Sequence, residues 1–442
     1  MPASSIVPGF LALPLVFLFP SDLPTHVGFE GLHTTILEPS TFVDPGEPHI
    51  VPLRRESVPV VRNGKVASWK TSYSGVLRAG APTQDFTVLF DTGSGHLVLP
   101  AVECVSESCV KHHRFNATAS SSSTAINIDG SVAGEECDEI SIKFGTGAVT
   151  GQFVRETICV GSKSETCVDM HVVLAVEMTV EPFSSFSFDG ILGLGLKGLS
   201  MTSDLSFFDL WSRTHTPLFG IFLSEGESEL ALGGYNLERL RGPLSWAPVA
   251  MEHLGYWQVE ILALRIGGVV SDICLDGTCR GVVDSGTSHL GVPHSHFLAF
   301  DDLLTTPSAP DVVDCRQVRA PLLEIVLKTA TLSLHADTYM RQLALPPGEN
   351  LGSREPSDSD MSRCSPRLLP VSVGAPLGPK LFILGEPVLQ QYYTVFDWQR
   401  KQIGFGLASR ASSELGDSTS FLQVEVLVQR RHCGSGRSAR GF

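Results

Sequence analysis

Two aspartates in matched surroundings are the residues of this 442-residue sequence best suited to chemistry. Asp91 lies in VLFDTGSGHLVLP (residues 88–100) and Asp284 lies in GVVDSGTSHLGV (residues 281–292). Each copy runs apolar residues into Asp-(Thr/Ser)-Gly-(Ser/Thr), which predicts a buried strand that ends in a tight glycine turn and presents the carboxylate. Because two close carboxylates do not both ionise easily, such a pair can hold one proton and supply both the base and the acid of a hydrolysis.

A second pair of matching segments indicates the elements that must position these aspartates. FDGILGL (188–194) follows the first turn and LFILG (381–385) follows the second, at nearly equal separations. This indicates an internal duplication with a period near half the chain, in a sequence long enough for two lobes with separate cores. The 42 glycines and 28 prolines favour turn-rich β structure over long helices. A single Asp-Gly turn would be an ordinary hairpin signal without function, but the duplication disfavours that interpretation.

The ordered series of motifs resembles the pepsin-like aspartic peptidases from about Tyr73 to Leu407. The matching segments are APTQDFTVLFDTGS, HHRFNATASSSST, FGTGAVTG, FDGILGL, GYWQV, VVDSGTS and ILGEPVLQQYYTVFDWQRKQIGF. The resemblance implies a mostly β, bilobal fold with an active-site cleft between pseudo-symmetric lobes. It implies an aspartic endopeptidase in which Asp91 and Asp284 activate a water molecule, with no covalent enzyme intermediate and no metal or organic cofactor.

The same resemblance assigns roles to the neighbours of the two aspartates. Thr92 and Ser285 would make hydrogen bonds between the lobes, and Gly93 and Gly286 would allow the tight turns. Ser94 and Thr287 would donate hydrogen bonds to the outer carboxylate oxygens. Such supporting groups hold the geometry that catalysis requires.

A flap that covers the substrate is expected at Phe144, Gly145, Thr146 and Gly147. The family usually has Tyr where this chain has Phe144, and Trp where it has Val98, so both partners of one hydrogen bond are absent together. Leu89, Val98, Phe144 and Ile191 would line an apolar pocket. We therefore expect a bulky apolar residue before the scissile bond.

Two other functional classes share some features of this sequence. A catalytically weak or silent homologue that binds peptides or proteins would keep the fold, and the Phe144 and Val98 departures favour it. A Ser/His/Asp hydrolase would need a G-x-S-x-G turn, which is not found in a suitable context. Gly193 to Gly198 formally matches the dinucleotide-binding pattern G-x-G-x-x-G, but it lacks a following βαβ unit, so a nucleotide site is not expected.

His96 and His289 each follow a catalytic Asp by five residues. This spacing suggests either side chains that change charge near neutral pH or ordinary packing and surface residues.

The chain is expected to divide into five segments. Residues 1–21 contain the apolar run IVPGFLALPLVFLFP and are predicted to be a signal peptide. Residues 22–68 are predicted to be a propeptide or N-terminal arm. The resemblance implies a lysine that pairs with the carboxylates before activation, and Lys65, or Lys70 just after this segment, could serve or could simply be solvated. Residues 69–244 and 245–409 are the expected N-terminal and C-terminal catalytic lobes. Residues 410–442 are the expected C-terminal tail, in which Phe421 to Val428 alternate weakly like a strand and the basic end, Arg430 to Arg440, is expected to be solvated or processed.

Ten cysteines fit an oxidising compartment. The resemblance places bridges at Cys104–Cys109, Cys274–Cys279 and Cys315–Cys364, and Cys159–Cys167 could close a short hairpin. Cys137 and Cys433 then remain as partners by elimination. A zinc site is disfavoured because the thiols are scattered without paired C-x-x-C knuckles. Asn116 begins the single glycosylation sequon.

Composition and charge limit the classes of molecule that the protein is expected to bind. The net charge of −15 argues against nucleic acid, because there is no basic stripe to neutralise phosphates. No segment after the signal peptide is long and apolar enough to be a membrane span. We expect extended polypeptides as substrates, a monomer, and a location in the secretory pathway, either secreted or in an acidic, lysosome-like vesicle.

Overall fold

Strands dominate the computed structural model, which describes residues 47–62, 65–144, 147–161, 166–308, 312, 314–344, 362–409 and 426–432. The predicted signal peptide and all of residues 22–46 lie outside these ranges. The helices within them are short: α1 (Glu107–Val110), α2 (Phe207–Trp211), α3 (Phe297–Leu304), α4 (Ala336–Tyr339) and α5 (Glu386–Gln391). Frequent Gly and Pro break up the apolar runs, which keeps helices short. The mostly β prediction is confirmed.

The largest sheet runs through both halves of the chain. From one edge to the other its strands are β12 (Ser245–Pro248), β25 (Gln402–Leu407), β24 (Tyr392–Asp397), β10 (Leu218–Phe222), β11 (Ser228–Leu232), β1 (His49–Arg62), β2 (Lys65–Ala79), β3 (Gln84–Asp91), β9 (Gly190–Gly193), β4 (Leu97–Pro100), β8 (Cys167–Met178), β7 (Gly147–Val160), β6 (Glu136–Phe144) and β26 (Val426–His432). The short β5 (Thr124–Ile126) pairs with β7.

The C-terminal half adds smaller sheets. One has the order β13 (Gln258–Glu260), β16 (Arg280–Val283), β23 (Leu381–Leu384), β17 (Leu290–Pro293) and β22 (Leu368–Val371). Another has the order β15 (Val269–Ser271), β14 (Ala263–Ile266), β19 (Leu323–Val326) and β20 (Thr331–Leu334), and β18 (Thr306–Pro307) pairs with β21 (Arg363–Cys364).

The duplication seen in the sequence is present in the strand pairings. In the first lobe β3 runs parallel to β9, β9 is antiparallel to β4, and β4 is parallel to β8. In the second lobe β16 runs parallel to β23, β23 is antiparallel to β17, and β17 is parallel to β22. A methyl group at Gly385, just after β23, would lie 2.3 Å from the Thr287 carbonyl oxygen, so this position needs glycine. The bilobal prediction is confirmed.

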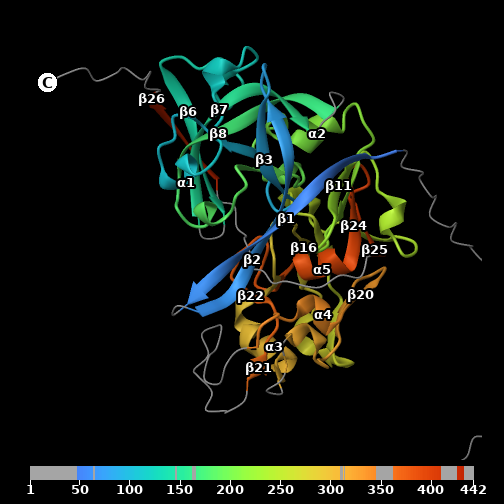
Figure 1. The fold of residues 1–442 in the computed structure, drawn as a ribbon. Helices are drawn as coiled ribbons and strands as arrows, with labels where there is room; N and C mark the ends of the chain where they lie inside the picture. Colours follow the sequence, from blue (N-terminus) through green and yellow to red (C-terminus); the bar gives the residue numbers. More distant parts are fainter. Residues whose placement is uncertain are drawn as a thin grey trace, which may run out of the picture. The chain divides into compact units, whose positions relative to one another are not determined.

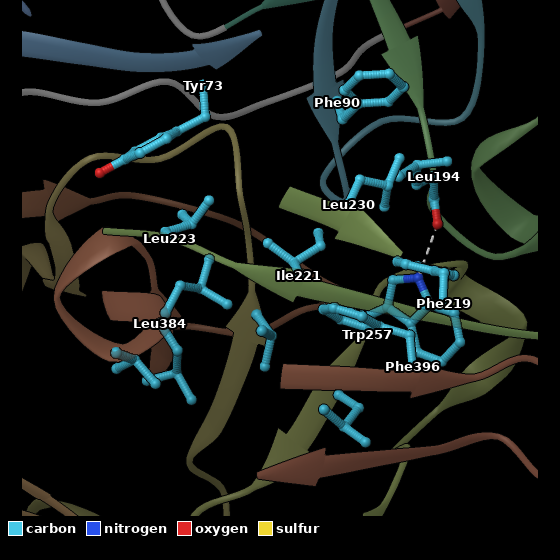
Figure 2. Packing of buried hydrophobic residues seen from close by; sticks show 14 of the residues in the cluster. Tyr73, Phe90, Leu194, Phe219, Ile221, Leu223, Leu230, Trp257, Leu384 and Phe396 are labelled. Carbon is cyan, nitrogen blue, oxygen red and sulfur yellow. Dashed lines mark hydrogen bonds between the residues drawn. The ribbon is translucent and has the colours of Figure 1, made fainter. Parts of the chain in front are cut away.

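Aromatic side chains pack in the core that both lobes share (Figure 2). The Phe219 ring stacks on Phe396 with centroids 4.6 Å apart, and Trp257 meets Phe396 edge-on at 5.1 Å. Trp257 is fully buried, and its indole nitrogen donates to the Leu194 carbonyl oxygen at 2.8 Å. Because Trp257 follows the second lobe's start and Leu194 belongs to the first, this bond fixes one lobe against the other. Truncating such an aromatic residue typically costs about 3–5 kcal/mol of folding free energy.

Both predicted flanking segments contribute strands. β1 lies in the predicted propeptide or arm, where it pairs with β11 and β2 (Figure 1). The expected lobe boundary at residue 69 falls inside β2, which begins at Lys65. Within the tail, residues 426–432 form β26, which pairs with β6. Residues 426–428 agree with the strand expected from their alternation. The expectation of a solvated end is wrong for residues 430–432, because they also pair with the edge of the sheet.

Four disulfides occur in the described residues: Cys104–Cys109, Cys159–Cys167, Cys274–Cys279 and Cys315–Cys364. Cys433 lies outside the described ranges, so its pairing with Cys137 stays a prediction. Asn116 is half-buried, and its side-chain oxygen accepts from the Thr118 backbone nitrogen at 3.1 Å. No helix in the described ranges is long and apolar enough to cross a membrane.

Candidate active site

The two aspartates lie at equivalent ends of equivalent strands. Asp91 is the last residue of β3, and Asp284 directly follows β16. Each carboxylate accepts a hydrogen bond from the glycine two residues later: Gly93 N donates to Asp91 Oδ1 and Gly286 N to Asp284 Oδ1, both at 2.9 Å. These local bonds hold each side chain against its own turn. The turn geometry expected from the sequence is therefore present at both sites.

Four hydrogen bonds lock the two turns together. Thr92 N donates to Ser285 Oγ and Ser285 N donates to Thr92 Oγ1, both at 3.0 Å. The hydroxyls then donate onward, Thr92 Oγ1 to the Val283 carbonyl at 2.9 Å and Ser285 Oγ to the Phe90 carbonyl at 2.7 Å. All these atoms are buried. Bonds of this kind fix the geometry of the two lobes at the point where the carboxylates meet.

The two carboxylates face the same small space. A methyl group at Gly286 would lie 2.6 Å from Asp91 Oδ1 and 3.3 Å from Asp284 Oδ1. Any larger residue at this position would push the two side chains apart. Asp284 is fully buried and Asp91 is 8% exposed, so both sit where water screens charge poorly.

The surroundings favour a proton on this pair. Burial raises the pKa of Asp284 well above its usual range, and the negative charge of Asp91 and the hydrogen bond between the two carboxyls add to the rise. The Thr287 hydroxyl and the Gly286 amide, which bond the ionised form, oppose it. The pair can therefore hold one proton in a range where an isolated carboxyl would be ionised.

The outer oxygens of the two carboxylates are not supported equally. Thr287 Oγ1 donates to Asp284 Oδ2, as expected. The equivalent Ser94 is 3% exposed, and its hydroxyl has no hydrogen-bond partner in the described part of the chain. The expected bond from Ser94 to Asp91 is therefore not made in this structure. Asp284 therefore has a hydroxyl donor at its outer oxygen and Asp91 has none in the described residues, although the two sequence motifs are alike.

The expected flap is the hairpin of β6 and β7, in which Phe144 pairs with Gly147. Gly145 and Thr146 lie outside the described residues. Leu89, Val98, Phe144 and Ile191 are all buried in one apolar cluster, together with Phe183, Phe186 and Phe188. The Phe144 ring meets Phe183 edge-on with centroids 5.9 Å apart. A small pocket adjoins this cluster and is lined by Val98, His112, Val149, Met178, Phe183, Phe188, Asp189, Gly190 and Ile191.

Of the two interpretations of His96 and His289, the structure favours packing residues over a charge change near neutrality. His96 and His289 are 2% and 1% exposed, and burial lowers the pKa of His96 to about 4 and that of His289 well below its usual range. Neither imidazole therefore changes charge near neutrality. The ion pair that the structure shows for Lys70 is with Glu181, at 3.4 Å between Nζ and Oε2. The side chain of Lys65 is outside the description.

Tyr256 is a site residue that the sequence reading missed. It is half-buried, and burial followed by the negative charges of Asp284 and Asp91 raises the pKa of its phenol to about 12. The phenol therefore stays neutral beside the carboxyl pair. The segment GYWQV matches the family in sequence. Its residue types alone do not indicate that the tyrosine lies near both aspartates. No group of three or more His, Cys, Asp or Glu in the described ranges is arranged to hold a metal.

Known proteins are similar to this chain over most of its length. The sequence profile of the eukaryotic aspartyl proteases matches residues 72–408. Pepsin A of Sus scrofa is 32% identical over 347 residues, covering 76% of this chain and 80% of that protein. Cathepsin E of Aquarana catesbeiana is 30% identical, covering 75% and 78%, and gastricsin of Callithrix jacchus is 31% identical, covering 76% and 82%.

Proposed function

The chain belongs to the family of eukaryotic aspartyl proteases and is an aspartic-type endopeptidase, and from this premise we propose that Asp91 and Asp284 are its catalytic pair. The observation that carries the proposal is the shared space around Gly286, where the two buried carboxyls approach each other. The hydrogen bonds among Thr92, Ser285 and the facing carbonyls keep that approach fixed.

The reaction uses the one proton that the pair holds. The ionised carboxyl takes a proton from a water molecule, whose oxygen attacks the peptide carbonyl carbon. The protonated carboxyl gives its proton to the carbonyl oxygen, which forms a neutral tetrahedral diol. The carboxyl that took the proton from water then gives it to the peptide nitrogen, while one hydroxyl of the diol returns its proton to the other carboxylate. The C–N bond breaks to leave a carboxylic acid and an amine, and the pair again holds one proton. No bond to the enzyme forms at any step.

The substrate would bind as an extended strand under the β6–β7 hairpin, through main-chain hydrogen bonds. A bulky apolar side chain before the scissile bond would enter the apolar cluster of Leu89, Val98, Phe144 and Ile191. Val98 is smaller than the family's usual Trp, and Phe144 packs on Phe183 without needing a polar partner. This supports a pocket that selects by apolar contact alone.

The four disulfides support a setting in the secretory pathway, either outside the cell or in an acidic vesicle. An acidic setting suits the pair, since burial favours the protonated form of Asp284. We propose that the protein acts there as a monomer on polypeptides.

Purified protein incubated from pH 3 to pH 7 with casein and with a peptide library tests the proposal. We expect cleavage at acid pH, inhibition by pepstatin, and a library profile dominated by Phe, Leu or Met before the cut. Asp284→Asn should lower kcat by at least about a thousandfold, because it removes one half of the acid–base pair. Equal cleavage by Asp284→Asn, or a profile dominated by Arg or Asp, would contradict it.

A silent peptide-binding homologue is the second candidate, favoured by the joint replacement at Phe144 and Val98. The same experiment separates the two. A wild-type protein that binds pepstatin but cleaves no peptide at any pH would be a binding protein. Restoring the polar pair with Phe144→Tyr and Val98→Trp would then show whether the replacement is the cause.

A further inference from the structure

His112 joins a short helix to the apolar pocket of the first lobe. It lies just after α1, is half-buried, and lines the small pocket together with Val98 and Ile191. Its Nδ1 lies 2.5 Å from the Ser108 carbonyl oxygen, and its Nε2 lies 2.9 Å from the Phe186 carbonyl oxygen. One imidazole ring therefore bridges two segments that are far apart in the sequence.

Both partners of this ring are hydrogen-bond acceptors. A neutral imidazole carries only one N–H, so its second nitrogen would direct a lone pair at a carbonyl oxygen. Only the imidazolium donates from both nitrogens, and bonds from a charged donor are the stronger ones. The contact with Ser108 lies within one turn of the same segment and changes little when the proton leaves. The contact between Nε2 and Phe186 is therefore the one that the neutral ring loses.

The helix α1 gives this ring a fixed support. Ser108 and Cys109 are fully buried, and a disulfide joins Cys109 to Cys104. The Ser108 hydroxyl donates to the Met178 carbonyl oxygen at 3.1 Å, and the Ser106 hydroxyl accepts from the Met178 backbone nitrogen at 3.2 Å. These bonds attach α1 to the end of β8. The ring therefore ties its second partner to a well-anchored part of the first lobe.

The segment that the ring ties is one wall of the pocket, and we call residues 183–188 the pocket wall. Phe183 and Phe188 line the pocket, and Phe186 stacks on Phe188 with centroids 5.2 Å apart. Phe183 also meets the flap residue Phe144 edge-on. A shift of the Phe186 backbone would therefore change the shape of the space that receives an apolar side chain.

Most charged groups near the ring are paired with each other. On its own segment, Lys111 Nζ lies 2.8 Å from Glu107 Oε1. On the side of the pocket wall, Lys70 of β2 pairs with Glu181 at 3.4 Å. These two ion pairs contribute little net charge. They leave the proton of the ring to be decided by its hydrogen bonds and by the remaining groups.

The remaining charged groups on the pocket side are acidic. Asp189 lines the same pocket, and Glu56 of β1 accepts from the Ser187 backbone nitrogen at 3.0 Å and from its hydroxyl at 2.7 Å. The exposed His113 directs its Nδ1 at a carbonyl oxygen of β3 at 2.7 Å, and Arg114 donates to carbonyl oxygens of the preceding loop. Acidic neighbours favour a cationic ring.

We propose that His112 is a positioning residue for the pocket wall, and that its cationic ring holds residues 183–188 in the shape that selects a bulky apolar side chain before the scissile bond. The proposal deepens the proposed function and rests on it. Histidine ordinarily changes charge between about pH 5 and pH 8. The wall is therefore held firmly in acid and loosens toward neutral pH, so selection weakens as the pH rises.

The first test compares two peptides that differ only in Phe or Ala before the scissile bond, from pH 4 to pH 7. The measured quantity is the ratio of their kcat/KM values. Ionisation of the catalytic pair affects both peptides equally and cancels in this ratio. For the wild type, the ratio should fall about fivefold as the pH rises, because the wall loses one hydrogen bond. A ratio that does not change with pH would overturn the proposal.

Variants of the ring assign this pH dependence to His112. His112→Phe keeps a ring without N–H groups and should give a low ratio at every pH, mainly through a higher KM for the Phe peptide. His112→Lys keeps a charged donor and should recover part of the ratio without its pH dependence. His113→Gln is the matched control and should behave as the wild type. A wild-type pH dependence in His112→Phe, or its loss in His113→Gln, would overturn the assignment.

The second test does not require cleavage and uses Asp91→Asn protein, which cannot digest itself. Hydrogen exchange of residues 183–188, corrected for the intrinsic effect of pH, should be faster at pH 7 than at pH 5. Addition of His112→Phe should make it fast at both pH values. Equal corrected exchange at both pH values without His112→Phe would overturn the proposal. If the wild type cleaves no peptide, the proposed function fails, whereas this exchange still decides the role of His112.

Discussion

Thr287 makes the two catalytic candidates chemically unequal. Its hydroxyl donates to Asp284, whereas the hydroxyl of the equivalent Ser94 has no partner in the described residues. A hydrogen bond to an ionised carboxylate favours that form and lowers its pKa. Thr287 therefore limits a pKa that burial and the charge of Asp91 push upward. By lowering the pKa of Asp284, Thr287 lowers the pH at which the pair loses its shared proton.

Thr287→Val should shift the alkaline limb of kcat/KM to higher pH by about one unit, because the ionised form loses a hydrogen bond worth about 1.5 kcal/mol or more. The value of kcat should fall as Asp284 loses its orientation. The measurement is the pH profile of kcat/KM for a single peptide. Thr287→Ser is the control, since it keeps the donor and should keep the wild-type limb. An alkaline limb that stays in place in Thr287→Val would contradict this account.

The repeated motifs predict the contacts of some site residues but not the burial of others. The roles of Thr92 and Ser285 are readable because their types and spacing repeat around both aspartates, and the structure shows the bonds that this symmetry suggests. The histidines at 96 and 289 repeat equally well, yet both are buried, and their burial depends on residues distant in sequence such as Met201, which donates to His96 at 3.4 Å. Repetition in sequence shows equivalent positions and does not show their environment.

At the scale of elements, the partners of strands next to motifs were predictable, whereas the partners of strands outside the duplication were not. The buried ends of β3 and β16, and the short β9 and β23, are apolar runs beside an Asp-Gly or glycine turn. In contrast, β1 contains Pro52 and Pro59 and several charges, and its partner β11 lies far along the chain. Such long-range pairing leaves no local signal. The same holds for β26, which pairs with β6 from the other end of the sequence.

The position of β26 gives the flap hairpin an outer neighbour. It pairs with residues 136–142 of β6, so the edge that β6 would otherwise expose is covered. A chain that ends after Ser409 should therefore have a more mobile hairpin. We expect KM to rise about three- to tenfold with a smaller change in kcat, because substrate closure is weakened more than the chemistry.

Hydrogen exchange of residues 136–144 is the direct measurement, and it should become faster in the shortened chain. A chain that ends after Cys433 is the control, because it keeps β26 and the predicted partner of Cys137. If exchange and KM are the same in the two shortened chains, the strand does not support the flap.

For the whole molecule, buried groups around the site act on stability in opposite directions as pH changes. Folding raises the pKa of Asp284, so the folded state binds that proton more tightly, and this contribution is present at acid pH and is lost as pH rises through the raised pKa. Folding lowers the pKa of His96 from 6.5 to about 4. The contribution of His96 to folding stability is fully present above pH 6.5, the pKa of the histidine in the unfolded chain. It is lost as the pH falls toward 4, the pKa in the folded protein. At acid pH, the stability that the protonated Asp284 contributes is therefore opposed by the cost of keeping His96 and His289 neutral.

His96→Gln should make the fold more resistant to acid. Each pKa unit corresponds to about 1.4 kcal/mol, so a shift from 6.5 to about 4 implies on the order of 3 kcal/mol lost between neutral pH and pH 4. Urea unfolding at pH 4 to 7 measures this, with Asp91→Asn present in both proteins so that self-digestion cannot interfere. The stability of His96→Gln relative to its parent should increase steadily as pH falls. A difference that is constant across the range would mean that His96 is protonated or exposed in the folded protein, which its buried position and its bond from Met201 both oppose.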